Sequence, residues 1–138
     1  CILCAKEAMA RGLPRRLALA ALLHDASECY MSDVPRPFKK SLPKYQRQEE
    51  KLLCIIYEKY LGTGLSAKEE QQLKNIDNDL LWYDLKFLLN EEPPQPKPSV
   101  CVPIDYTVRP FQEVEDEYRM LFKQLRADIH NSDLLDHD

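Results

Sequence analysis

The sequence predicts an all-α fold, and three observations support that prediction. Only three glycines interrupt the 138 residues, and most of the ten prolines gather in two short stretches. β-branched residues are sparse, and no stretch of strand length alternates between apolar and polar side chains. Apolar residues instead recur at helical spacing through most of the chain. We therefore expect a single helical domain of about five or six helices over residues 1–126, followed by a polar tail over residues 127–138.

The composition narrows the functional class. Hydrophobic residues make up 44% of the chain and charged residues 30%, as in an ordinary globular domain. A net charge of −4 argues against a broad nucleic-acid surface, although a local cluster of Lys and Arg could still hold a phosphorylated ligand. The five cysteines are an odd number, and Cys54 falls within an amphipathic helical pattern, where a reduced thiol packed in the core is expected. These features favour a reducing, cytoplasmic compartment, and no signal peptide or membrane-spanning segment is recognisable.

Glycine and proline mark the first two helices. A helix over residues 1–11 should end at Gly12, because a glycine just past a helix readily takes the left-handed conformation. Pro14 suits the first turn of the second helix, which we expect to continue to about Cys29. The chain starts at Cys1 inside a helical pattern and without a capping residue. We therefore expect the natural protein to have residues before Cys1.

The middle of the chain is divided in the same way. Residues 30–43 contain three prolines and are expected to form a loop. A helix over residues 44–60 follows, with apolar residues along one side. Ser66 and Glu69 have the spacing of a capping box, in which each side chain satisfies a free backbone N–H of the other residue. This pattern predicts a further helix over residues 66–89.

The last part of the chain begins with a proline-rich connection. Residues 91–110 hold six of the ten prolines, so they should form neither a helix nor a central strand but an extended connection. Helical spacing of apolar residues then resumes at Phe111 and predicts a last helix, to about Arg126, that packs on the core. The tail contains a group that imitates a metal-ligand cluster, namely His130, Asp133, Asp136 and His137. We interpret this group as a decoy, because chain ends beyond the last packed helix are usually disordered.

An apolar run from Leu17 to Leu23 ends abruptly in His24 and Asp25. A helix that is apolar on all sides belongs in the middle of a domain. An adjacent His and Asp is weak evidence by itself, since short motifs often arise by chance. At the end of a buried helix, however, an ionisable pair needs a charged partner or a metal to offset its desolvation. Imidazole and carboxylate together suit Zn, Mn, Fe, Co or Ni.

The residues after this pair extend it into a longer, ordered motif. Its members are His24, Asp25, Glu28, Asp33, Pro35, Pro37 and Lys39. This motif resembles that of the HD-domain metal-dependent phosphohydrolase superfamily, and it is closest to the branch of 5′-deoxynucleotidases and related small HD hydrolases. The resemblance covers roughly residues 1–89, and the last helix matches in kind only. It implies a compact, all-helical bundle of the HD type.

The resemblance also implies a metal site, built in the family from a first histidine, the His-Asp pair and a distant aspartate that starts a helix. Asp77 is the best match for the distant aspartate. Asp79 is its rival, and because the two lie two residues apart on a helix, both cannot face one metal. The first histidine has no match in residues 1–16, and its expected position falls just before Cys1. The implied ligands are thus His24, Asp25 and Asp77, for a divalent ion such as Mn, Co, Zn, Fe, Ni or Mg.

Further roles follow from the resemblance. The family's counterpart of Glu28 takes part in water activation or in protonation of the leaving group, and that of Asp33 orients the attacking water or the sugar. Glu28 lies four residues after His24, so we expect it one turn further along the same helix face. Arg36 and Lys39 are the candidates for contact with phosphate.

These roles imply a phosphomonoesterase that hydrolyses a (deoxy)nucleoside 5′-monophosphate. Two alternatives stay open: another HD chemistry, on an alarmone or a cyclic nucleotide, and a catalytically degenerate HD domain that binds a nucleotide or a partner without turnover. The expected partner is a small nucleotide, with no nucleic acid and no membrane. The family resemblance also suggests a homodimer.

Overall fold

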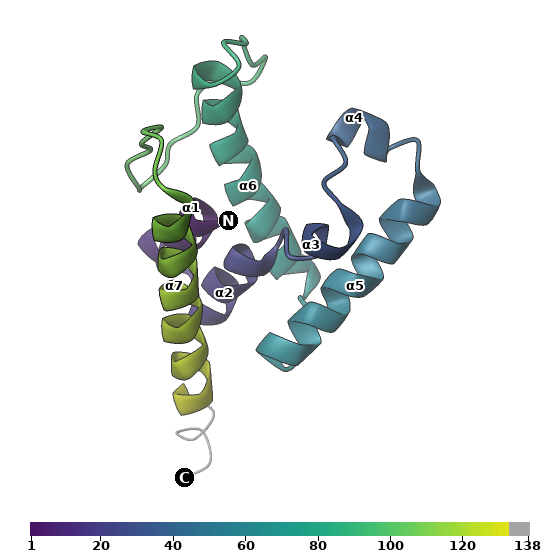
Figure 1. The fold of residues 1–138 in the computed structure, drawn as a ribbon, viewed down its shortest axis with the longest axis vertical. Coiled ribbons are helices and arrows are strands. Elements are labelled where there is room, and N and C mark those ends of the chain that lie inside the picture. Colours follow the sequence, from purple (N-terminus) through teal and green to yellow (C-terminus); the bar gives the residue numbers. More distant parts are fainter. Residues whose placement is uncertain (133–138) are drawn as a thin grey trace.

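The computed structural model describes residues 1–132, with side chains through Ala127, and no strand is present in this part of the chain. The all-α prediction is confirmed. The helices are α1 (Ile2–Ala10), α2 (Arg15–Leu23), α3 (Glu28–Met31), α4 (Arg36–Lys39), α5 (Pro43–Leu61), α6 (Ala67–Phe87) and α7 (Phe111–Ser132) (Figure 1). The tail group of His130, Asp133, Asp136 and His137 lies outside the described side chains.

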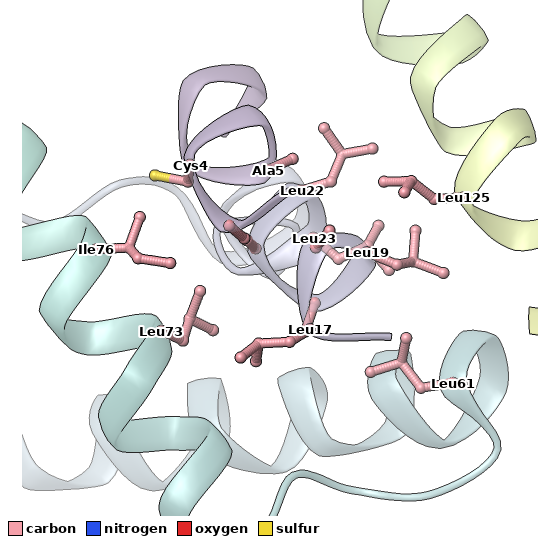
Figure 2. Packing of buried hydrophobic residues seen from close by; sticks show 14 of the residues in the cluster. Cys4, Ala5, Leu17, Leu19, Leu22, Leu23, Leu61, Leu73, Ile76 and Leu125 are labelled. Carbon is pink, nitrogen blue, oxygen red and sulfur yellow. The ribbon is translucent and has the colours of Figure 1, made fainter. Parts of the chain in front are cut away.

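Helix α2 is the centre of the core. Every residue from Leu17 to Leu23 is buried, and α1, α5, α6 and α7 all contact this helix (Figure 2). Ala5 and Ala8 of α1 are also fully buried, and such small side chains let two helices approach closely. Burial of each leucine contributes about 1.5–3 kcal/mol. The packing therefore fixes the C-terminal end of α2 in the middle of the molecule.

Local sequence signals set several of the helix ends. Gly12 and Gly62 follow α1 and α5 with φ angles of 71° and 84°, the left-handed region that glycine enters without steric cost. At the start of α6, Ser66 Oγ accepts a hydrogen bond from the Glu69 N–H (3.3 Å), and Glu69 Oε2 accepts one from the Ser66 N–H (2.8 Å). The predicted capping box is confirmed.

Helix α2 ends at Leu23 rather than near Cys29, where we expected it to stop. Residues 24–27 form a tight turn, closed by a hydrogen bond from the Glu28 N–H to the Asp25 carbonyl (3.0 Å). No glycine or proline marks this stop in the sequence. The helix ends where its buried apolar run gives way to polar side chains, and the short helix α3 begins after the turn.

The loop expected over residues 30–43 contains a further short helix, α4. Pro35 lies just before α4 and Pro37 lies in its first turn. A proline is tolerated there because the first N–H groups of a helix have no partner within the helix. Pro35 and Pro37 therefore mark the start of the short helix α4 within a segment that we expected to be a loop.

The proline-rich segment over residues 91–110 forms neither helix nor strand, as predicted. Two aromatic side chains of α6 hold it. Trp82 Nε1 donates a hydrogen bond to the Gln95 carbonyl (2.9 Å), and the Tyr83 hydroxyl donates one to the Pro98 carbonyl (2.8 Å). These bonds attach part of the segment to α6.

Two further expectations are wrong. Helix α7 continues to Ser132 instead of ending near Arg126. Cys54 is exposed instead of packed in the core, because the buried side of α5 is formed by residues such as Ile56 and Tyr57. Within the described residues, no helix is both long and apolar enough to cross a bilayer.

Candidate metal centre

Three helices bring polar side chains together beside the end of α2. His24 and Asp25 follow the last residue of α2, Asp77 lies on α6, and Cys4 is on α1. The neighbour of Asp77, Ile76, is fully buried, and Figure 2 shows it near Cys4, on the side of the core where α1 and α6 meet. The apolar packing of these helices thus determines where the polar groups lie.

The imidazole of His24 is the common point of this cluster. Its Nε2 lies 3.2 Å from Asp25 Oδ2 and 3.6 Å from Asp77 Oδ1. Its Nδ1 lies 2.7 Å from the carbonyl oxygen of Ala21. A carbonyl can only accept, so Nδ1 carries a proton and donates it. A backbone bond of this kind orients a metal-binding imidazole and leaves Nε2 free to act as a ligand.

The cluster stabilises positive charge at His24. Burial alone would lower the pKa of His24, but the hydrogen bond with Asp77 and the negative charge of Asp25 outweigh burial and raise it. The same hydrogen bond lowers the pKa of Asp77 in spite of its partial burial, with the charge of Arg36 adding to the effect. A group of carboxylates around one ring nitrogen favours a cation there, whether a proton or a metal ion.

Asp77 and Asp79 occupy different faces of α6. Asp77 points to His24, whereas Asp79 Oδ2 accepts a hydrogen bond from the Arg11 guanidinium (2.8 Å). The structure therefore brings Asp77 to the His-Asp pair and leaves Asp79 in an ion pair with Arg11, which follows the last residue of α1.

Two thiols belong to the same cluster, and the sequence prediction did not include them. Cys1 Sγ donates a hydrogen bond to Asp25 Oδ2 (3.2 Å). Ligand atoms of Cys4, His24 and Asp77 all lie within 4.8 Å of one another, as do those of Cys1, His24 and Asp25. The Cys-Ile-Leu-Cys spacing at the start of the chain is a pattern typical of metal or redox sites, and it was the signal that could have identified these residues.

A cavity of about 190 Å³ lies beside the cluster. Its lining residues are Cys1, Leu3, Cys4, His24, Asp25, Asp77, Leu80, Leu81, Asp84 and Ile104. Carboxylate oxygens, an imidazole nitrogen and thiol sulfurs thus face one small space. This donor set fits a divalent first-row metal ion, because such ions accept mixed N, O and S ligands.

Glu28 lies near the cluster but not where we expected it. It starts α3, after the turn that ends α2, so it is not one turn further along the helix face of His24. Partial burial and the negative charges of Asp25 and Asp33 raise the pKa of Glu28, and Lys39 opposes this shift. A glutamate with a raised pKa retains its proton more readily, as a proton donor requires.

The remaining residues of the predicted site differ in their surroundings. Asp33 is exposed, and Lys39 forms an ion pair with Glu49 (2.8 Å). Arg36 donates hydrogen bonds to Asp77 Oδ2 and to the side-chain oxygen of Asn78 (3.0 Å for the latter). Arg36 therefore lies directly beside the metal-capable cluster, whereas Lys39 is engaged with α5.

Glu7 is a structural residue of this region that the sequence prediction missed. Its carboxylate is fully buried and accepts hydrogen bonds from the backbone N–H groups of Cys101 (2.9 Å) and Val102 (3.0 Å) and from Arg11 Nε (2.7 Å). These bonds attach the proline-rich segment to α1. Ile104, shortly after them, forms part of the cavity wall. No local pattern in the sequence links Glu7 with this distant backbone.

A curated bacterial protein is similar to part of this chain. A stretch of 48 residues is 50% identical to "Uncharacterized protein YfdR" of Escherichia coli (strain K12). The match includes 35% of this chain and 27% of that protein, so the chain spans about a quarter of the length of this relative. No family model and no solved structure matches the chain.

Proposed function

We propose that this chain is a metal-dependent phosphohydrolase of the HD type that cleaves the phosphomonoester of a (deoxy)nucleoside 5′-monophosphate. The observation that carries the proposal is the convergence of His24 Nε2 with carboxylate oxygens of Asp25 (3.2 Å) and Asp77 (3.6 Å). The HD-type motif at residues 24–39 supplies the reaction class. Under this proposal the protein acts in the cytoplasm, as its cysteine content indicates, and as a homodimer, as the resemblance implies.

In this mechanism His24, Asp25 and Asp77 would hold the divalent ion. When bound, such an ion lowers the pKa of water and polarises phosphoryl oxygens. Two basic side chains of the chain itself provide positive charge for the phosphate. Arg36, next to Asp77, binds the phosphate oxygens through its guanidinium, a geometry suited to such anions. Lys39, held by Glu49, adds positive charge on the side of Glu28.

Hydrolysis of the phosphomonoester also needs a group that protonates the leaving oxygen and a group that orients the water or the sugar. Water attacks phosphorus, the P–O5′ bond breaks, and the products are inorganic phosphate and the nucleoside. One proton of the water stays on the phosphate, and the other replaces the proton that Glu28 gives to the leaving group. Glu28 protonates the leaving O5′, a role that its raised pKa supports. Asp33, which is exposed, orients the attacking water or the sugar, as the resemblance implies.

Phosphate release from dAMP and dGMP tests the proposal. We expect Asp25→Ala and Glu28→Ala each to abolish release. Asp116→Ala, which removes an exposed carboxylate of α7, should leave the rate unchanged. Wild-type rates in Asp25→Ala would overturn the assignment of the site.

A substrate panel separates this proposal from the alternatives. Turnover of an alarmone or a cyclic nucleotide without turnover of monophosphates would change the substrate class but keep the metal site. Nucleotide binding without turnover of any of these compounds, in a metal-loaded protein, would favour a degenerate HD domain.

A further inference from the structure

Cys4 is a metal-capable group that the proposed mechanism leaves unused. Its side chain is only 5% exposed and projects from α1 on the side of the core where Ile76 of α6 lies (Figure 2). Buried, unmodified cysteines usually pack as small apolar side chains. Cys4 belongs to the core in this way, but it also lines the cavity together with Asp25, Asp77 and Asp84. An uncharged thiol gains little from these carboxylates, whereas a cation bound among them would be stabilised.

The geometry points to the Cys4 thiolate as an additional ligand of the divalent ion, alongside His24 and Asp77. This inference rests on the metal site of the proposed function and specifies its chemistry further. A site with sulfur, nitrogen and oxygen ligands binds Zn²⁺ or Co²⁺ in preference to Mg²⁺, because thiolate is a soft ligand and Mg²⁺ prefers oxygen alone.

The distances are compatible with one ion. Ligand atoms of Cys4, His24 and Asp77 lie within 4.8 Å of one another. Zinc binds sulfur at about 2.3 Å and nitrogen or oxygen at about 2.0–2.2 Å, so in tetrahedral geometry two ligands of one ion lie roughly 3.3–3.6 Å apart. Side-chain rotations that move the ligand atoms by about 1 Å would close the site. The backbone can stay in place, because α1, α2 and α6 are already fixed by the core.

Cys1 is the rival thiol. It lies one helical turn before Cys4, it is exposed, and its Sγ donates to Asp25. The rigid position of Cys4 favours it over Cys1, because a buried ligand loses less conformational freedom when the metal binds. Cys29, exposed and outside the cavity lining, provides a matched control.

Cobalt spectroscopy of the 138-residue chain tests the inference without depending on activity. The chain is stripped of metal under reducing conditions and titrated with Co²⁺. Visible d–d bands report that cobalt is bound, and a near-ultraviolet charge-transfer band reports that a thiolate is among the ligands. We expect both signals in the wild type, Cys1→Ser and Cys29→Ser. In Cys4→Ser the charge-transfer band should disappear and Zn²⁺ affinity should fall about tenfold or more.

Each other outcome is decisive. Visible bands without a charge-transfer band in the wild type would overturn thiolate ligation and leave the proposed metal site intact. A band that survives in Cys4→Ser but is lost in Cys1→Ser would assign the ligand to Cys1. Absence of cobalt binding by the wild type would overturn this inference together with the metal site itself.

A second measurement covers the case in which Cys4→Ser fails to fold. Wild-type chain is treated with iodoacetamide with and without Zn²⁺, and each cysteine is quantified by peptide mass spectrometry. We expect Zn²⁺ to slow alkylation of Cys4 by about tenfold or more relative to the change at Cys29. Equal changes at the two cysteines would contradict the inference.

Discussion

His24 Nε2 lies 3.6 Å from Asp77 Oδ1, so the end of α2 meets α6 at one point of the molecule. The two residues are distant in sequence, and apolar packing brings them together. Leu73, Ile76 and Leu80 are the buried residues of α6, and they belong to the same core as α2. Asp77 follows Ile76 directly and therefore lies at the edge of this buried side. The site is thus positioned by the core.

Leu19 is fully buried in α2, at the centre of the hydrophobic core. We expect Leu19→Ala to lower the free energy of unfolding by about 2–5 kcal/mol, because it removes buried methyl groups and leaves a cavity. Leu89→Ala is the matched control, since Leu89 is 63% exposed, and it should change stability by no more than about 0.5 kcal/mol. Urea unfolding measures both. Similar losses in the two variants would contradict the central position of α2.

Glu7 is expected to hold the proline-rich segment on α1. Glu7→Gln keeps the size of the side chain but removes the charge that strengthens its bonds to Cys101 and Val102. The variant should lose about 1–3 kcal/mol of stability, and hydrogen exchange at the amides of Cys101 and Val102 should become faster. Glu115→Gln, at an exposed ion pair with Arg119, should change little. Unchanged exchange in Glu7→Gln would show that other contacts hold the segment.

The same residue gives a pH prediction. Burial alone would raise the pKa of Glu7, but hydrogen bonds from Arg11, Cys101 and Val102 outweigh burial and lower it. The unfolded chain therefore binds the proton more readily, with a glutamate pKa of about 4.3. The stability that Glu7 contributes is present above that pH and is lost as the pH falls through the lower, folded pKa. We expect the difference in unfolding free energy between wild type and Glu7→Gln to shrink in acid. A difference that is constant with pH would contradict this account.

Much of the fold was predictable because its signals are local. Gly12 and the Ser66–Glu69 capping box gave helix ends that the structure confirms. The stop at Leu23 was not predictable in this way, since it depends on where the buried environment of α2 ends rather than on a glycine or proline. The exposure of Cys54 was missed for a related reason, because spacing alone does not show which side of α5 meets the core.

The candidate site was likewise predictable only where its signals are local. His24 and Asp25 are adjacent in the sequence, so their grouping was predictable. The spacing of Asp77 and Asp79 on one helix showed that only one of these two aspartates could join the pair. Tertiary packing then brought Asp77 to His24. It also placed Glu28 after a turn and tied Lys39 to Glu49, neither of which follows from residue spacing.

Arg36 should act on substrate binding. Its guanidinium donates hydrogen bonds to Asp77 and Asn78, and under the proposed function it binds the phosphate of the substrate beside Asp77. We expect Arg36→Ala to raise KM for a nucleoside monophosphate by about tenfold or more, since a hydrogen bond to a charged group is worth about 1.5–3 kcal/mol. Arg47→Ala is the control, because Arg47 is an exposed arginine of α5 that bonds the Pro43 carbonyl. Steady-state kinetics distinguish them, and equal KM values in wild type and Arg36→Ala would remove Arg36 from the binding site.

The metal content of Asp77→Asn and Asp79→Asn tests the candidate metal centre most directly. Each variant is dialysed against Zn²⁺ or Co²⁺, free metal is removed, and circular dichroism checks that the protein is folded. Both changes replace a carboxylate by an amide at neighbouring positions of α6, but only Asp77 faces His24, and Asp79 is bound to Arg11. We predict that wild type and Asp79→Asn retain a single tightly bound ion per chain and that Asp77→Asn loses it. Equal metal content in Asp77→Asn and wild type, or loss of the ion from Asp79→Asn alone, would contradict the assignment of this site.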